Sequence, residues 1–171
     1  MLKLKNISPH IRKIYNESDY YVKIRILFQQ IDPSTGVCYW NVYGQENSFT
    51  EFSLHNPTGA IYDLTVLCMD SSIQHKNIPI VLSNIPEQIG FPLFETYLEK
   101  YQSGYYHLPD EKIDFKIYAS AKNTTILFSL DQVVLHVINN PIIFGFNENN
   151  HLCYIHIQNM ALNDEGFLEK I

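Results

Sequence analysis

The stretch from Thr124 to Asn159 constrains the fold more than any other part of this 171-residue chain. Apolar and polar side chains alternate along it, as at residues 126–130 and 133–137, and β-branched residues are frequent. Asn-rich breaks at residues 139–141 and 147–150 supply side chains that tolerate the positive φ angles of tight turns. The pattern predicts three or four consecutive antiparallel strands at the centre of a sheet.

Shorter alternating segments predict further strands. Residues 20–31 and 37–43 flank the turn at residues 32–36, whose Pro and Gly favour a reversal of the chain, so a hairpin is predicted there. A second hairpin is predicted at residues 142–158. The remaining predicted strands are residues 52–54, 60–69, 78–82 and 112–119.

Two short helices are predicted outside these strands. Residues 92–102 place apolar side chains at helical spacing after a proline, and residues 163–169 begin with Asn163 as an N-cap. The lead-in at residues 1–18 is either a short helix or irregular. We expect residues 1–171 to form a single domain of the α+β class, mainly β, as an antiparallel sheet, a sandwich or a partial barrel. It should contain about six to nine strands and one or two short helices.

Composition bears on the compartment and the core. A hydrophobic fraction of 46%, with 12 Tyr and 10 Phe, argues against a disordered chain, and Trp40 is the largest core candidate. No apolar run reaches the roughly 18 residues of a spanning helix, and no signal peptide is recognisable. We therefore expect a soluble, cytoplasmic protein with no membrane partner, in which Cys38, Cys68 and Cys153 are buried, reduced thiols.

The net charge of −6 is unevenly distributed. Residues 1–25 hold six basic and two acidic side chains, whereas the rest of the chain holds six basic and 16 acidic ones. So acidic a body repels nucleic acid and attracts a basic partner by long-range steering. The alternative is that most of these charges only keep the protein soluble.

The sequence contains no recognised catalytic or metal-binding motif. His151, Cys153 and His156 are close in sequence, but on a strand Cys153 and His156 face opposite sides, which leaves too few ligands for a structural zinc. His136 is expected to be neutral and hydrogen-bonded. Asp63, inside a predicted strand, is either solvated, the commoner arrangement, or a buried carboxylate with a partner. We expect no catalytic residue, cofactor or metal.

In overall character, and in the closing segment IIFGFNENNHLCYIHIQN (residues 142–159) followed by the acidic tail NDEGFLEKI (residues 163–171), the chain resembles the immunity proteins of bacterial contact-dependent and polymorphic toxin systems. This resemblance implies a non-enzymatic protein that binds and neutralises a cognate toxin, often a basic nuclease, by covering its active site. It supplies no site residues.

A partner surface should combine aromatic anchors with acids that pair with Lys and Arg. One segment offers both in density, and the alternative is that its Tyr pack on the sheet while its acids are merely solvated. The predicted partner-binding residues are Glu95, Tyr97, Glu99, Tyr101, Tyr105, Tyr106, Asp110, Glu111 and Asp114.

Two other functions fit the composition. The first is a small-ligand-binding β domain with an aromatic-lined cavity, and the second is an accessory subunit of a larger assembly. The aromatics available for such a cavity are equally explained by packing in the core. They are Trp40, Tyr43, Phe128, Phe144 and Tyr154.

Overall fold

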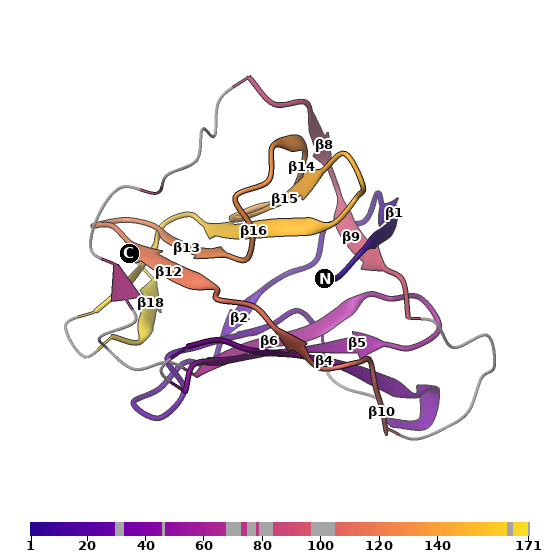
Figure 1. Ribbon diagram of the computed structural model, residues 1–171, viewed down its shortest axis with the longest axis horizontal. Helices are drawn as coiled ribbons and strands as arrows, with labels where there is room; N and C mark the ends of the chain where they lie inside the picture. Colours follow the sequence, from indigo (N-terminus) through magenta and orange to yellow (C-terminus); the bar gives the residue numbers. More distant parts are fainter. Residues whose placement is uncertain are drawn as a thin grey trace.

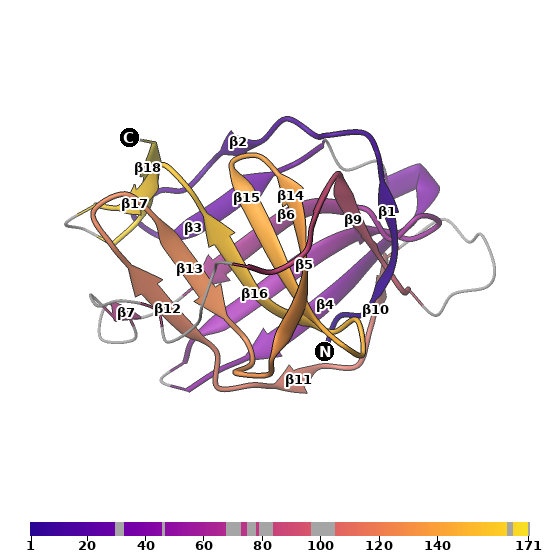
Figure 2. The ribbon, with the colours of Figure 1, turned by 90° about the horizontal axis from the view of Figure 1, so that it is seen from above.

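The computed structural model describes residues 1–29, 33–45, 47–67, 73–74, 78, 84–96, 105–163 and 166–170. These residues form a mainly β protein in which two sheets lie face to face (Figure 1), with the strands of one crossing over those of the other (Figure 2). The mainly β prediction is confirmed. The helical part of the described chain is one 3-10 turn, Pro33–Thr35, so no described helix is long and apolar enough to cross a membrane.

Sheet 1 has seven strands in the order β10-β4-β5-β6-β3-β2, with β11 also beside β4. Strands β4, β5 and β6 form an antiparallel meander, and β3 lies beyond β6 in a Greek-key arrangement. The bounds are β2 (Tyr15–Asn16), β3 (Ile24–Leu27), β4 (Val37–Tyr43), β5 (Phe49–His55), β6 (Ile61–Leu67), β10 (Tyr105–His107) and β11 (Glu111–Lys112).

The hairpin predicted from residues 20–43 is wrong, because β3 pairs with β6 and β2 rather than with β4. The turn chemistry is present, with a positive φ of 81° at Gly36, but it shows only that the chain changes direction. Across the β3–β6 pair, Arg25 faces Thr65 and lies close enough to Asp63 for their charges to attract. Local sequence patterns do not reveal this attraction, because the two residues lie on strands that are distant in sequence.

Sheet 2 also has seven strands, in the order β7-β12-β13-β16-β15-β14-β8. The four strands of residues 124–159 are antiparallel, as predicted, and β15 and β16 form the predicted second hairpin around a turn that contains Asn150 at a φ of 62°. The bounds are β7 (Ile73–Gln74), β8 (Glu87–Ile89), β12 (Lys116–Ala119), β13 (Thr124–Leu127), β14 (Val133–Asn139), β15 (Ile142–Asn147) and β16 (Leu152–Ile157).

The sheets are mixed rather than purely antiparallel. Strands β10 and β11 run parallel to β4, β7 runs parallel to β12, and β8 runs parallel to β14. The described residues contain 18 strands, more than predicted, because many edge strands have only two or three residues. Such short segments show too little alternation to be recognised in a sequence.

In both segments predicted to be helical, the structure has a strand over part of the length. Strand β9 (Phe91–Phe94) covers the start of the segment 92–102 and pairs with β1 (Leu4–Ser8), while residues 97–102 lie outside the described part. Strand β18 (Leu168–Lys170) pairs with β17 (Met160–Leu162) where the second helix was predicted. Asn163 Oδ1 accepts a hydrogen bond from the Phe167 N–H, and residues 164–165 of the predicted helix lie outside the described part.

Three other predicted strands differ in extent. The segment 112–119 is divided between β11 in sheet 1 and β12 in sheet 2, and Phe115 is buried where the chain crosses between the sheets. Strand β5 extends well beyond the predicted residues 52–54, and β6 lies within the predicted residues 60–69. Residues 79–82 of the strand predicted at 78–82 lie outside the described part.

One apolar core fills the space between the sheets. Trp40 is 1% exposed, as expected of the largest core candidate, and its ring contacts Phe52 of sheet 1 and Phe128 next to β13, with centroids 5.2 and 5.9 Å apart. A smaller cluster on the far side of sheet 2 contains Cys153 and Tyr154. Every residue of β16 is therefore buried.

Gly59, in the turn between β5 and β6, packs directly against the backbone of β9. Gly59 has a φ of +74°, its carbonyl accepts a hydrogen bond from the Phe94 N–H, and a Cβ there would overlap the Phe94 carbonyl oxygen. We expect Gly59→Ala and Gly59→Asn each to lower the free energy of unfolding by at least about 2 kcal/mol in urea denaturation. Asn tolerates positive φ, so near-normal stability of the Asn variant would show that backbone conformation, not overlap, requires glycine.

Candidate functional site

The outer face of sheet 1, turned away from the core, carries the most unusual chemistry of the described residues. In Figure 1 no described strand lies on that side of the sheet. The neighbours of these residues along each strand, such as Trp40 and Phe52, point into the core. The outer face is formed by Arg25, Tyr39, Asn41, Tyr43, Phe49, Glu51, Ser53, Asp63, Thr65 and Leu67, with Tyr105 and His107 at its β10 edge.

A row of rings forms one side of this face. The Tyr39 ring stacks on the Tyr105 ring and on the His107 ring, with centroids 6.0 and 5.2 Å away and interplanar angles of 25° and 29°. The parallel pairing of β10 with β4 sets this stack, because it places His107 opposite Tyr39. Tyr105 remains 59% exposed. A stacked, exposed aromatic row has little rotamer entropy to lose on contact with a partner.

Two carboxylates lie beside the aromatic row. Asp63 is 4% exposed and accepts a hydrogen bond from Ser53 Oγ at 3.2 Å, so it is the buried carboxylate with a partner rather than the solvated one. Burial raises the pKa of Asp63, and the Ser53 hydrogen bond and the Arg25 charge only partly oppose this. Burial also raises the pKa of Glu51, with a further contribution from the charge of Asp63. Both carboxylates therefore ionise at a cost to the folded protein.

Two of the predicted partner-binding residues reach this face. Tyr105 stacks on Tyr39, and Asp110 accepts a hydrogen bond from Asn41 Nδ2 at 3.2 Å. Tyr106 instead packs partly against the core. Three others, Tyr97, Glu99 and Tyr101, lie outside the described residues.

The remaining three predicted residues have partners within the chain. Glu111 accepts a hydrogen bond from Trp40 Nε1 at 2.9 Å and pairs with the N-terminal ammonium of Met1. Glu95 lies 3.3 Å from Lys3 Nζ. Asp114 lies 4.0 Å from Lys116 Nζ in a pair that is about half exposed. The structure therefore does not bring these three acids to the outer face.

Sequence reasoning missed Tyr39, Glu51, Asp63 and His107 as members of one surface. Alternation in VCYWNVY shows that Tyr39 and Tyr43 share a face, so part of the signal was available. The neighbours of β4 are set by contacts between distant segments, which alternation does not report.

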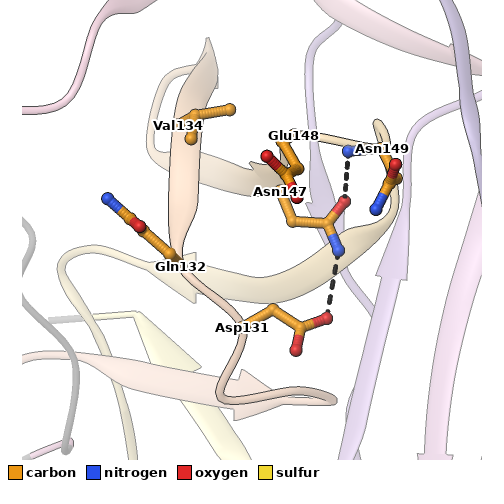
Figure 3. Close-up of a pocket in the computed structure, with 6 residues that line it drawn as sticks. All are labelled: Asp131, Gln132, Val134, Asn147, Glu148 and Asn149. Carbon is orange, nitrogen blue, oxygen red and sulfur yellow. Dashed lines mark hydrogen bonds between the residues drawn. The ribbon is translucent and has the colours of Figure 1, made fainter.

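A polar depression lies at one end of sheet 2 (Figure 3). Asn147 is its central residue: its Nδ2 donates to Asp131 Oδ2 at 3.0 Å, and its Oδ1 accepts from the N–H groups of Asn149 and His151. These bonds tie the β15–β16 turn to the loop before β14. Both ends of the Asn147 amide are thus hydrogen-bonded within the fold, and we interpret the depression as structural.

The far side of sheet 2 holds two buried histidines. His136 Nε2 shares a hydrogen bond with the Tyr154 hydroxyl, and His156 Nδ1 shares one with Thr125 Oγ1 at 2.8 Å. Burial lowers the pKa of both histidines, so they are neutral at physiological pH, as expected for His136.

The described residues hold no metal centre at the thiols Cys38 and Cys153 or at the sequence cluster of residues 151–156, and Cys68 lies outside the described part. Burial raises the pKa of Cys38 and of Cys153 to about 11, so both are protonated and unreactive. A bulge in β16 places Cys153 with Tyr154 on the outer side of sheet 2, instead of the strict alternation expected from sequence. In the described ranges, no three or more His, Cys, Asp or Glu side chains lie close enough together to hold a metal ion.

The five aromatic residues considered for a ligand cavity lie in three separate parts of the molecule. Trp40, Phe128 and Phe144 pack in the core between the sheets. Tyr154 lies on the far side of sheet 2, and Tyr43 is 44% exposed on the outer face of sheet 1. They do not line one cavity, and core packing accounts for the three between the sheets.

The raised pKa of Asp63 predicts a pH-dependent stability. The folded protein holds this proton more tightly than the unfolded chain, so stability falls as pH rises from the ordinary pKa of 3.8 through the raised value. We expect Asp63→Asn to increase the free energy of unfolding at pH 7 and to lose most of that gain near pH 4. Urea denaturation across this pH range measures it, with exposed Glu148→Gln as control. An equal gain at both pH values would contradict the assignment.

Removal of the Glu111 carboxylate should lower the stability of the protein, because its partners lie within the chain. Glu111→Ala leaves the buried Trp40 N–H without an acceptor, and we expect a loss of about 1–3 kcal/mol in stability. Glu111→Gln keeps the acceptor and should lose less. Tyr105→Ala, at an exposed position, should change stability by no more than about 0.5 kcal/mol. Equal effects of Glu111→Ala and Tyr105→Ala in chemical denaturation would contradict this distinction.

Comparison with known proteins adds no family to this geometry. No protein-family model matches the chain, and no curated protein matches it in sequence. The chemistry of the outer face of sheet 1 is therefore the basis for a functional proposal.

Proposed function

We propose that this protein is a non-enzymatic, cytoplasmic, single-domain inhibitor of the immunity type, which binds a cognate toxin through the outer face of sheet 1. The favoured partner is a basic protein such as a nuclease. The observation that carries the proposal is the combination, on one sheet face that no described strand covers, of a stacked aromatic row with a half-buried and a buried carboxylate.

The carboxylates support binding because they weaken the free protein. Burial and mutual repulsion raise the pKa of Glu51 and of Asp63, and the charge of Arg25 opposes this only in part, so the ionised carboxylates lower the stability of the free protein. A Lys or Arg side chain placed beside them would offset that cost in the complex. Groups that lower stability without serving the core are commonly found at functional sites.

The aromatic row supports a protein partner rather than a solvated surface. Tyrosine is enriched at the centres of protein interfaces, where a rigid ring contributes a large contact area at low entropy cost. Tyr39 and Tyr105 provide such rings next to acids. The net charge of −6 would in addition speed the approach of a basic partner.

The test uses variants that leave the core intact. We expect Tyr105→Ala and Asp110→Lys to weaken binding to the toxin encoded directly upstream by more than about 2 kcal/mol. Tyr105→Ala should change thermal stability little, whereas Asp110→Lys leaves the Asn41 amide N–H without its acceptor and should lower stability by about 1–3 kcal/mol. Glu148→Lys makes the same charge reversal on sheet 2, away from the outer face, and is the matched control.

Isothermal titration calorimetry gives the affinity, and growth of cells that co-express the toxin gives protection. Unchanged affinity in both outer-face variants would place the partner surface elsewhere. An upstream gene for a transport or metabolic enzyme, with no toxin, would contradict the immunity function itself.

A further inference from the structure

Asn41, in the middle of the outer face, has a buried oxygen that lacks a hydrogen-bond donor. The side chain is 8% exposed, and its Nδ2 donates to Asp110 Oδ1 at 3.2 Å. A carboxylate only accepts hydrogen bonds, so this contact fixes which end of the amide faces Asp110. Among the described residues, none donates to Asn41 Oδ1. A buried carbonyl left unpaired costs about 1–3 kcal/mol, which a ligand that donates there would recover.

The groups around Asn41 are also acceptors. Glu51 lies directly opposite Asn41 across the β4–β5 pair, and the charges of His107 and Arg25 only partly offset the burial and the repulsion from Asp63 that raise its pKa. Asp110 is exposed beside β4, and among the described residues the Asn41 amide is its one hydrogen-bond donor. Three side chains thus present oxygens at one place on the sheet. Their complement must be a group with several donors and a positive charge.

Aromatic rings lie on both sides of Asn41. Tyr39 and Tyr43 occupy the positions two residues before and two residues after it, on the same face of β4. Tyr39 belongs to the stacked row, and the Tyr43 ring contacts Phe49 with centroids 5.2 Å apart. Ring faces beside carboxylates favour a flat cation, because a guanidinium stacks on an aromatic surface while its edge donates to oxygen.

We propose that Asn41, Glu51 and Asp110, flanked by Tyr39 and Tyr43, form a subsite for the guanidinium group of an arginine side chain. The five N–H donors of a guanidinium lie in one plane and point in several directions, which suits three separate acceptors. A lysine ammonium is a more strongly hydrated point charge and gains less from the rings. The role of this arginine as the partner's anchor rests on the proposed function; the chemistry of the subsite does not.

The experiment titrates the full-length, 15N-labelled protein with Nα-acetyl-arginine amide and follows backbone amide shifts by NMR. We expect saturable shifts centred on Asn41, Glu51 and Asp110, with a dissociation constant in the millimolar range. The lysine analogue should bind at least threefold more weakly. The citrulline analogue, which has the same shape without the charge, should produce no saturable shifts.

Variants test the named groups. Glu51→Gln keeps the shape and removes a charge that lowers stability, so it should fold at least as well as the native protein and bind the arginine probe at least fivefold more weakly. Asn41→Leu, of similar volume, should also fold and should also bind the arginine probe at least fivefold more weakly. Glu148→Gln should leave binding of the probe unchanged. Equal binding of arginine and citrulline probes, shifts elsewhere on the protein, or full binding by folded Glu51→Gln would overturn the proposal.

The two proposals can fail separately. Arginine binding without affinity for any upstream toxin would sink the inhibitor function and keep the subsite. Toxin affinity that falls with Tyr105→Ala but is unchanged by Glu51→Gln and Asn41→Leu, together with no binding of the arginine probe, would keep the inhibitor function and overturn the subsite.

Discussion

One buried indole packs against residues of both sheets. Trp40 packs against Phe52 of its own sheet and against Phe128 of the other, so its ring occupies the middle of the shared core. Its N–H has to be satisfied there, and Glu111 supplies the acceptor from β11, immediately before the chain crosses to sheet 2. The same carboxylate pairs with the N-terminal ammonium. One polar contact thus fixes the core, the crossover and the start of the chain together.

This contact also explains why the composition of the outer face of sheet 1 was only partly predictable. A segment dense in Tyr and acids is what a partner surface requires, yet side-chain direction decides the outcome. Asp110 turns outward to Asn41 while Glu111, the next residue, turns inward to Trp40. Sequence composition weights the two acids equally. Only the pairing of β11 with β4 separates them, and that pairing joins residues about 70 positions apart.

The same limit explains what was predictable in the fold. Residues 124–159 contain four adjacent strands with local turns, so alternation and turn chemistry were sufficient there. Sheet 1 depends on the pairing of β3 with β6, which are distant in sequence, and on parallel edge strands. Neighbouring residues in the sequence do not indicate such pairs. At residues 91–94 an apparent helical spacing after Pro92 competes with pairing to β1, and tertiary pairing prevails because a proline is tolerated in an edge strand.

The short outermost strands affect how other proteins can approach. In the described part of each sheet, the last strand at either side has only two or three residues: β2 and β10 in sheet 1, β7 and β8 in sheet 2. A border this short offers few free backbone groups for an added strand, which protects the fold from edge-to-edge aggregation and from amyloid-like growth. Binding of a partner by addition of a strand is thereby disfavoured. Selection among partners would depend instead on the side chains of the sheet faces between the edge strands.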